Sequence, residues 1–329
     1  MTVKSGLVAD IGGTNARLGI AEGLGRPVRS IRVYAGRDFN DFESLIRAYL
    51  SDSGEPMPRH GCLAIAGPVA DNRARLTNGA WGVDGNRIAS LFGMEACEVV
   101  NDFTALAWAL PWLGEDQLLA VGPAATPRGE ARRARLVVGP GTGLGVSALI
   151  EQGGLRVAVR SEGGHVGFAP RDEAESELLN WFRLHYERVS AERLMCGHGL
   201  ELLHQALGDI AGQPRAAVPA PEITAGALAD PKSEHAGTID CFLGLLGAFA
   251  GDLCLAMGAD RVYIGGGIVP RLTQILPQSP FRRRFTDKGR FQEHLEAIPT
   301  HVITDPLPAL AGTSARMFDP CIPGSPFET

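Results

Sequence analysis

Lysine is scarce in this sequence: its 329 residues include only Lys4, Lys232 and Lys288, and none of them follows a glycine. A Walker A loop needs a Gly-Lys-Ser/Thr segment, so this phosphate-binding device is absent. The G-x-G-x-x-G fingerprint of dinucleotide-binding proteins is missing too, because "GPGTGLG" at 139–145 spaces its glycines differently and precedes the strand-like "VSALIE" rather than a helix. The sequence therefore disfavours P-loop nucleotide binding and NAD binding.

An excess of positive charge is also missing, because the formal net charge is −6 at pH 7 and the pI is near 5.8. Nucleic acids and acidic membranes are bound by basic faces, so we expect neither as a partner. Two arginine clusters, at 132–135 and 281–285, are interpreted as solvated faces or loops, with a basic binding patch as the alternative.

Cysteines are few and scattered. The six of them form no Cys-x-x-Cys pair and no Cys/His cluster with zinc spacing, so we expect reduced thiols, no structural zinc and a cytoplasmic location. No charged and apolar segments precede the first predicted strand, so we expect no secretory signal. The apolar stretch at 241–259 is interrupted by Asp252 and is predicted to be a buried core helix rather than a membrane span.

The chain alternates strand-like and helix-like runs, which is typical of an α/β protein. Two apolar strands, at 6–12 and 16–22, enclose a glycine turn and predict a hairpin. The same order of strand, glycine turn and strand returns at 136–151, after a connection at 122–135 that we expect to be exposed. The chain is therefore predicted to contain two related lobes.

A third glycine turn, at 265–267, follows an apolar strand at 261–264. Any one of these turns has an ordinary explanation as a tight turn, but glycine turns also let backbone amides approach phosphate oxygens closely. A phosphate-binding hairpin used twice, with a third turn for the nucleoside, resembles the sugar kinase, actin and Hsp70 superfamily. The resemblance implies a two-lobed actin-like ATPase (ribonuclease H-like) fold with duplicated α/β domains and a cleft between them.

In this fold the glycine turns would bind ATP. Asp10 beside a polyphosphate makes sense if a Mg²⁺ ion lies between them, held through water, and a turn-capping carboxylate is the alternative. The expected nucleotide-binding residues are Asp10, Gly12, Gly13, Thr14, Asn15, Arg17, Gly141, Thr142, Gly143, Gly265, Gly266 and Gly267.

Three polar segments lie between the glycine turns: "VVND" at 99–102, "SEGGHVGF" at 161–168 and "VSAERL" at 189–194. Taken singly they read as an Asx turn with a helix N-cap, a loop histidine and a solvated glutamate. Together they resemble the bacterial glucokinases of the hexokinase-like type, from about residue 7 to beyond residue 310. The resemblance implies that the sugar hydroxyls are held by Asn101, Asp102, Glu162, His165 and Glu192.

The resemblance also implies an activity. A glucokinase phosphorylates D-glucose with ATP, as the first step of glycolysis, and Asp102 would accept the proton of the 6-hydroxyl. Gly167 and "MCGHGL" at 195–200 depart from the family pattern and leave the sugar preference open, so the alternative is a kinase for another hexose such as mannose or fructose. The cysteine-rich zinc motif of the related ROK family is missing after His165.

The expected domains are a small one, residues 1–112 plus 302–329, and a large one, residues 113–301. The helix-like "PALAGTSARMF" at 308–318 would cross back to the small domain, and the resemblance implies a homodimer. A sugar-responsive transcription regulator with this fold would need a DNA-binding module, for which we expect no room before residue 7. An actin-like filament protein would leave the five sugar-binding residues unexplained.

Overall fold

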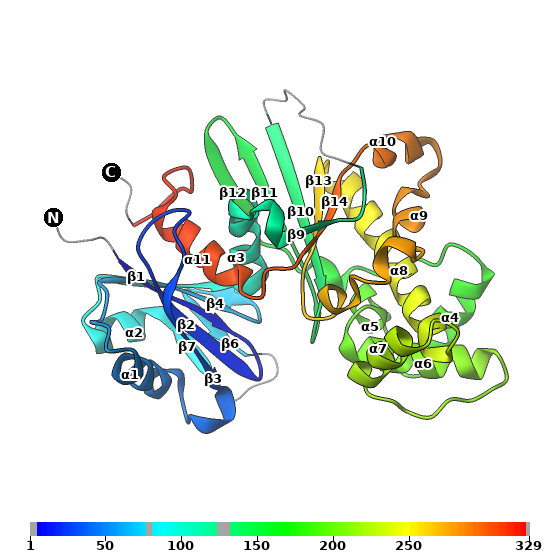
Figure 1. Ribbon diagram of the computed structural model, residues 1–329, viewed down its shortest axis with the longest axis horizontal. Coiled ribbons are helices and arrows are strands. Elements are labelled where there is room, and N and C mark those ends of the chain that lie inside the picture. The colour runs from blue at the N-terminus through cyan, green and yellow to red at the C-terminus, as the bar shows by residue number, and fades with distance from the viewer. Residues whose placement is uncertain (1–4, 77–80, 124–131, 327–329) are drawn as a thin grey trace.

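The protein consists of two α/β lobes joined by a central pair of helices, as the computed structural model in Figure 1 shows. The structure describes residues 5–76, 81–123 and 132–326. The predicted fold, an actin-like pair of duplicated α/β domains, is confirmed by the sheets described below.

The first lobe is built on a five-stranded sheet. Its strands lie in the order β3 (Arg29–Ala35), β2 (Asn15–Ala21), β1 (Gly6–Ile11), β4 (His60–Ile65) and β8 (Ala96–Asn101). β1 and β2 form the predicted antiparallel hairpin, whereas β4 and β8 run parallel to β1. A small sheet of β5 (Val69–Ala70), β6 (Arg73–Arg75) and β7 (Gly82–Asp84) lies beside it.

Strand residues alternate between the two faces of the first sheet, as the pleat requires. Leu7, Ala9 and Ile11 pack in one core with the helices α1 (Phe42–Ser53) and α2 (Gly85–Phe92). Val8 points to the opposite face and belongs to a different core, which the first lobe shares with the second. The sheet is therefore covered on both sides.

The second lobe repeats this plan. Its sheet has the order β12 (Leu155–Val159), β11 (Leu144–Gln152), β10 (Arg132–Pro140), β13 (Arg261–Ile264), β14 (Thr300–Ile303) and β9 (Leu118–Ala120). β10 and β11 form an antiparallel hairpin, and β13 and β14 run parallel to β10. The first five strands match the first sheet in order and direction, so the predicted duplication is confirmed.

Two helices cross between the lobes. α3 (Asp102–Ala109) follows the fifth strand of the first sheet and packs on β10 and β11 of the second. α11 (Pro308–Phe318) follows β14 and packs on β1 and β4 of the first sheet. The helices meet so closely that a Cβ atom on Gly312 would lie 1.8 Å from the carbonyl oxygen of Ala105. α11 has the bounds predicted for the returning segment.

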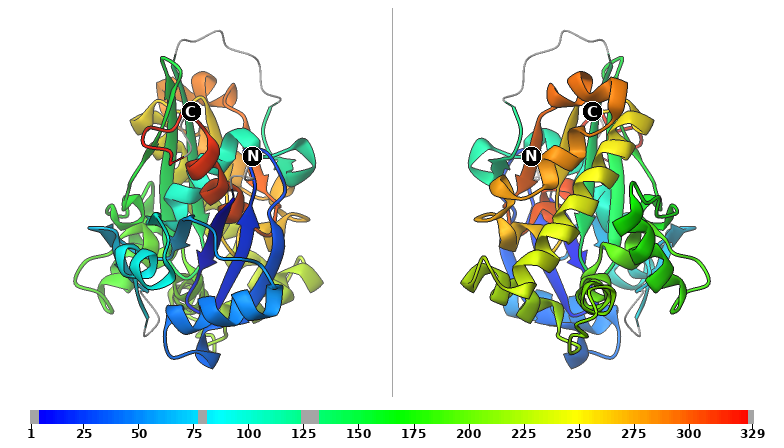
Figure 2. Two further views of the ribbon diagram at one scale, coloured as in Figure 1. Left: turned by 90° about the vertical axis from the view of Figure 1, so that its left-hand side faces the viewer. Right: turned by 90° about the vertical axis from the view of Figure 1, so that its right-hand side faces the viewer.

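The remaining helices belong to the second lobe, where α8 (Glu234–Met257) runs along one face of the sheet (Figure 2) and other helices pack on α8. α8 is long and apolar enough to span a membrane by composition, but most of its apolar window is buried inside the protein, as predicted for a core helix. It begins seven residues before the predicted apolar stretch, because Ser233 caps its N-terminus. The other helices are α4 (Glu173–Arg183), α5 (Ala191–Leu194), α6 (Gly197–Ile210), α7 (Ala220–Ala229), α9 (Phe281–Thr286) and α10 (Gln292–Glu296).

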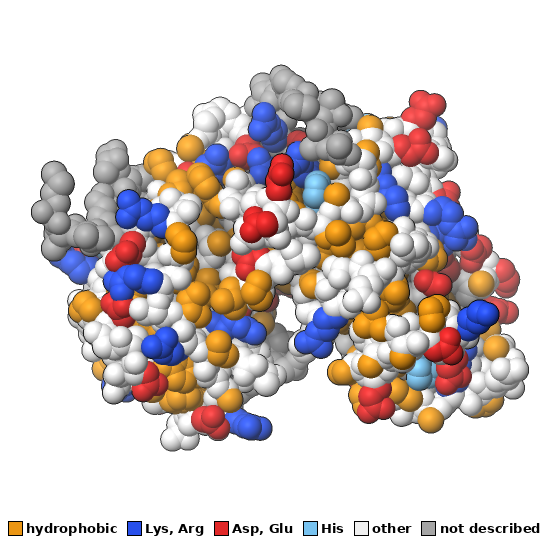
Figure 3. All heavy atoms as spheres, in the orientation of Figure 1, with side chains coloured by type: hydrophobic (Ala, Val, Ile, Leu, Met, Phe, Trp, Pro, Cys, Tyr) orange, Lys and Arg blue, Asp and Glu red, His pale blue; other side chains and the backbone are white. Residues whose placement is uncertain are grey.

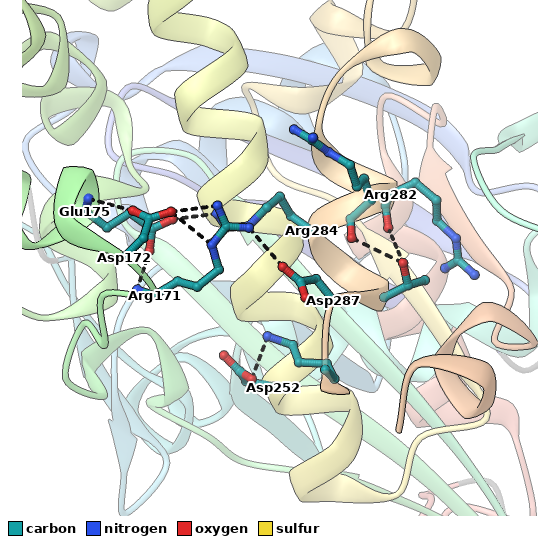
Figure 4. Close-up of polar contacts among 10 residues, drawn as sticks. Arg171, Asp172, Glu175, Asp252, Arg282, Arg284 and Asp287 are labelled. Atoms are coloured by element: carbon teal, nitrogen blue, oxygen red, sulfur yellow. Dashed lines mark hydrogen bonds and ion pairs between the residues drawn. The ribbon is translucent and has the colours of Figure 1, made fainter. Parts of the chain in front are cut away.

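The interpretation of the arginine clusters as solvated faces or loops is wrong for Arg284, which is buried, whereas Arg133 and Arg283 are exposed. Arg284 on α9 forms an ion pair with Glu175 on α4 at 2.6 Å, and both side chains are only 9% exposed. Figure 4 shows this pair beside Arg171, which binds Asp172 and also Asp287 after α9. A buried charge needs a partner, and the charge of Arg284 is balanced by Glu175 rather than by solvent.

The predicted connection at 122–135 is only partly described. Residues 124–131 lie outside the described residues, and the last four residues of the segment are the start of β10. Arg135 pairs with Glu151 across the β10–β11 hairpin at 2.9 Å. The proposed boundary at residue 302 falls inside β14, and the division into 1–112 plus 302–329 and 113–301 remains a proposal.

Candidate active site

The first glycine turn is closed by its own backbone. The amide of Gly12 donates to the carbonyl of Asn15 at 3.0 Å, and the amide of Gly36 donates to the carbonyl of Thr14 at 2.8 Å. Neither Gly12 nor Gly13 has a positive φ. Glycine at these positions therefore contributes the absence of a side chain rather than an unusual backbone angle.

Asp10 and Arg17 face each other at the base of this turn. They are paired in the β1–β2 register, and Arg17 Nη1 donates to Asp10 Oδ2 at 3.1 Å. Burial raises the pKa of Asp10, although the Arg17 charge opposes the shift. A carboxylate at the base of a phosphate-type turn supplies the oxygen ligands that a hydrated Mg²⁺ ion prefers, so Asp10 fits a water-mediated magnesium site.

The second and third glycine turns lie against each other. The amide of Gly265 donates to Val138 O at 2.8 Å, and the amide of Ile268 donates to Pro140 O at 3.2 Å. Gly266 has φ +81°, and a Cβ atom there would lie 2.4 Å from Pro140 O. The amide of Gly141 donates to Gly143 O at 2.8 Å and closes the second turn. Thr142, in the same turn, is exposed, and Gly267 lies in the third turn.

Asn101 and Asp102 have different structural roles. Asn101 ends β8 and caps α3, because its Oδ1 accepts from the amides of Phe103 and Thr104 at 2.9 and 3.1 Å. Its Nδ2 donates to Gly67 O at 3.1 Å. Asp102 is the first residue of α3, so the helix-cap interpretation applies to Asn101 and leaves Asp102 without that role.

The pKa of Asp102 is raised from 3.8 to about 7. Burial is the main cause, and the negative charges of Asp10 and Glu162 add to it, while a hydrogen bond from the Phe103 amide to Oδ1 works against it. A carboxyl group that titrates near neutrality is unusual, and such groups concentrate in active sites. Asp102 can therefore exchange a proton at physiological pH.

The second lobe contributes three further polar side chains. His165 Nε2 lies 3.9 Å from Glu162 Oε2, and His165 Nδ1 lies 3.8 Å from Glu192 Oε1. The other oxygen of Glu192 accepts from the amide of Leu144, in the second glycine turn, at 2.9 Å. Glu192 therefore contacts both His165 and the second glycine turn. This contact could not be predicted from the sequence, because Glu192 and Leu144 are far apart in it.

A cavity of about 160 Å³ is lined by residues of both lobes. Figure 3 shows that one face of the molecule is hollowed between the two lobes. The cavity brings together Asn101 from one lobe and Glu162 from the other. Its lining also contains Arg160 and Ser161, which were not predicted as site residues. Both lie next to the predicted Glu162, at the start of the segment 161–168 or just before it. The lining residues are Pro68, Val69, Val99, Val100, Asn101, Thr104, Arg160, Ser161 and Glu162.

The chain is similar to known glucokinases over most of its length. The sequence profile of the family described as Glucokinase matches residues 7–319. The glucokinase of Ralstonia nicotianae is 43% identical over 332 aligned positions, which cover 96% of each chain. The glucokinase of Chromohalobacter salexigens is 41% identical and is aligned over 94% of this chain and 96% of its own length.

Longer proteins match as well. The "Bifunctional protein glk" of Burkholderia thailandensis is 42% identical over 94% of this chain, but only 48% of that protein is aligned. This chain thus spans about half the length of the Burkholderia relatives. Among solved structures, glucokinase from an Antarctic psychrotroph is 31% identical with a TM-score of 0.84, covering 95% of this chain and 98% of that one. Balamuthia mandrillaris glucokinase in complex with glucose, 21% identical, has a TM-score of 0.77 with coverage of 94% and 92%.

Proposed function

This chain belongs to the glucokinase family, and from that premise we propose that it phosphorylates the 6-hydroxyl of D-glucose with ATP. The observation that carries the proposal is Asp102, a carboxyl group with a pKa of about 7 beside the interlobe cavity, at the N-terminus of a helix that another residue caps. A general base is most effective when its pKa lies near the working pH.

Asp102 acts as the proton acceptor in this proposal. The 6-hydroxyl attacks the γ-phosphorus in line, its proton passes to a carboxylate oxygen of Asp102, and the bond from the γ-phosphorus to the β,γ-bridging oxygen breaks. In the loose transition state of phosphoryl transfer the proton moves late. The base therefore has to hold the hydroxyl in position as well as accept its proton.

The sugar is held from both lobes. Asn101 has one amide hydrogen left after its bond to Gly67, and the carboxylates of Glu162 and Glu192 can each accept from sugar hydroxyls. His165 lies between the two glutamates. Charge-assisted hydrogen bonds of this kind are stronger than neutral ones, which suits a ligand with adjacent hydroxyl groups.

The glycine turns hold the nucleotide in this proposal. Amides of the first turn, with the side chains of Thr14, Asn15 and Arg17, face the phosphates, and the second and third turns bind the rest of ATP. Asp10 would hold a Mg²⁺ ion through water, and this ion would neutralise charge on the phosphate oxygens. Closure of the lobes would exclude water, which otherwise competes with the sugar as acceptor.

A coupled assay of the purified protein with glucose, ATP and Mg²⁺ tests the activity. We expect glucose 6-phosphate to form, with glucose preferred over mannose and fructose in kcat/KM, and with activity lost in excess EDTA. No turnover of any hexose would contradict the kinase assignment. Faster turnover of mannose or fructose than of glucose would show that the preferred substrate is another hexose. Full turnover in excess EDTA would contradict the proposed binding of Mg²⁺ by Asp10.

We also propose a cytoplasmic enzyme that forms a homodimer, as the family resemblance implies. Size-exclusion chromatography with light scattering measures the mass directly. The chain has a mass of 34.8 kDa, so a particle of this mass at micromolar concentration would contradict the dimer.

A further inference from the structure

Three potential metal ligands meet in the second lobe, and none of them belongs to the site described above. His204 lies on α6, and Glu234 and His235 are the first two residues of α8. One ligand atom from each residue lies within 4.8 Å of the others. The His204 side chain is 1% exposed and its Nε2 lies 3.7 Å from Glu234 Oε1, while the rings of His204 and His235 stack with centroids 5.0 Å apart.

The hydrogen bonds around His204 define its tautomer. The Thr238 hydroxyl donates to Glu234 O at 3.0 Å and lies 2.9 Å from His204 Nδ1, so we assign the ring hydrogen of His204 to Nδ1, which then donates to this hydroxyl. With this assignment the lone pair of the His204 ring lies on Nε2. The buried Nε2 has no hydrogen-bond partner and points its lone pair at a carboxylate oxygen.

His204 Nε2 is buried without a hydrogen-bond partner and faces a carboxylate oxygen of the exposed Glu234, an arrangement that a cation between the two would satisfy. Zinc binds histidine nitrogen and carboxylate oxygen at about 2.0–2.2 Å, so two ligands of a tetrahedral ion lie about 3.3–3.6 Å apart. The 3.7 Å between His204 Nε2 and Glu234 Oε1 is close to this separation. Arg215 Nε forms an ion pair with the other oxygen of Glu234 at 3.2 Å and so orients the carboxylate toward the histidine.

We propose that His204, Glu234 and His235 bind a divalent transition-metal ion of the zinc class, with water as the fourth ligand. His235 is partly buried, and its Nδ1 packs against Gly226 of α7, where a Cβ atom would lie 2.2 Å away. The site differs from the ROK zinc motif, because it uses no cysteine. The expectation of no structural zinc rested on Cys/His spacing, whereas the ligands proposed here come from two distant segments with no motif spacing.

The ion would join α6 to the start of α8. The amide of Gly197, the first residue of α6, donates to Gly141 O in the second glycine turn at 2.8 Å. The metal would therefore stabilise a helix that contacts the nucleotide-binding surface, without taking part in phosphoryl transfer. Because the native chain alone presents the three ligands together, binding should raise the melting temperature.

The test uses the full chain without an affinity tag, treated with chelator and dialysed, and zinc alone as the titrant in the absence of ATP. We expect one equivalent of zinc by calorimetry and elemental analysis, a Tm rise of about 4 °C at a hundredfold excess over Kd, and the visible spectrum of tetrahedral cobalt when Co²⁺ replaces zinc. His235→Ala and Glu234→Gln should each weaken zinc binding at least tenfold.

His198→Ala is the matched control, because His198 lies on the same helix, is exposed and pairs with Glu201. It should bind zinc as the wild type does. Absence of zinc binding by the wild type at 100 µM would overturn the proposal. Equal binding by the wild type, His235→Ala and Glu234→Gln would overturn it too, because the metal would then be held elsewhere, for example by the thiols. Circular dichroism of each variant establishes that it is folded.

Discussion

The two hairpins occupy the same place in their sheets but differ at one cross-strand pair. In the first, Asp10 faces Arg17, and the two form an ion pair. In the second, the corresponding pair is Gly139 and Gly145. Cβ atoms at these glycines would lie 2.6 and 2.0 Å from the ring of Phe103, so an aromatic side chain fills the space that charged groups fill in the first hairpin.

This difference separates two tasks. The first hairpin presents a carboxylate, which suits a cation and phosphates, whereas the second removes its side chains so that α3 can approach. Phe103 follows Asp102, so the glycine pair determines how close the proposed base lies to the second lobe. The two hairpins are similar in structure but differ in role. In the first, the Asp10–Arg17 pair presents charged groups, whereas in the second the Gly139–Gly145 pair leaves room for α3.

The largest expected effect is that of Asp102→Asn. The amide can accept the Phe103 hydrogen bond but cannot accept a proton, and Asn101 continues to cap α3. We expect kcat to fall by about 10² to 10⁴, with KM values for glucose and ATP changed much less. Steady-state kinetics on the folded variant measures this, and a kcat within a few-fold of the wild type would leave the mechanism without its base.

A second pair of variants compares the two glutamates of the sugar site. Loss of a charge-assisted hydrogen bond costs roughly 1.5 to 3 kcal/mol, so Glu162→Ala should weaken glucose binding about tenfold to a hundredfold and spare ATP. Glu192→Ala should weaken both ligands, because Glu192 also accepts from Leu144 in the nucleotide turn. Calorimetric titration of each ligand checks this. Equal ATP affinities in the two variants would break the proposed link.

Gly145→Ala tests the positioning role of the glycine pair. Its methyl group would overlap Phe103, and overpacking of this kind costs about 1 to 3 kcal/mol. We expect a lower Tm and a lower kcat, both partly restored by adding Phe103→Leu. Gly237→Ala on α8, where a Cβ atom meets nothing within 4 Å, is the control and should not lower the Tm. A normal kcat in Gly145→Ala would show that Phe103 does not position Asp102.

The smallest effect concerns pH. Because only the ionised carboxylate of Asp102 accepts a proton, kcat/KM should fall about tenfold per pH unit below about 7 and level off above it. The folded pKa exceeds the unfolded value near 3.8, so the native state binds more protons between these values and its stability falls as pH rises through this window. Asp102→Asn should therefore have a higher Tm than the wild type at pH 8 and little advantage at pH 4. A flat kcat/KM profile between pH 5.5 and 8 would contradict the shifted pKa.

Much of the fold follows from local patterns. The bounds of β13 and α11 match the predicted segments, and both hairpins were predicted from apolar runs around glycines. Side-chain partners far apart in sequence were not predictable. The burial of Arg284 depends on Glu175, more than one hundred positions earlier, and the capping role passed to Asn101 because β8 ends one residue before Asp102. The nucleotide and sugar residues could be named only through the family resemblance, since each has an ordinary structural explanation alone.

Each of the helices α3 and α11 packs on the sheet of the other lobe, and this has a consequence for folding during synthesis. The first sheet is complete once β8 ends at Asn101, but one face of it is covered by α11, which begins at Pro308. Val8, Cys62 and Ala64 on that face are fully buried in the finished protein. At about 5–20 residues per second, synthesis of the intervening segment takes about 10–40 s. Until α11 has been made, the nascent first lobe lacks the helix that covers this apolar face, and exposed apolar surface of this kind favours aggregation.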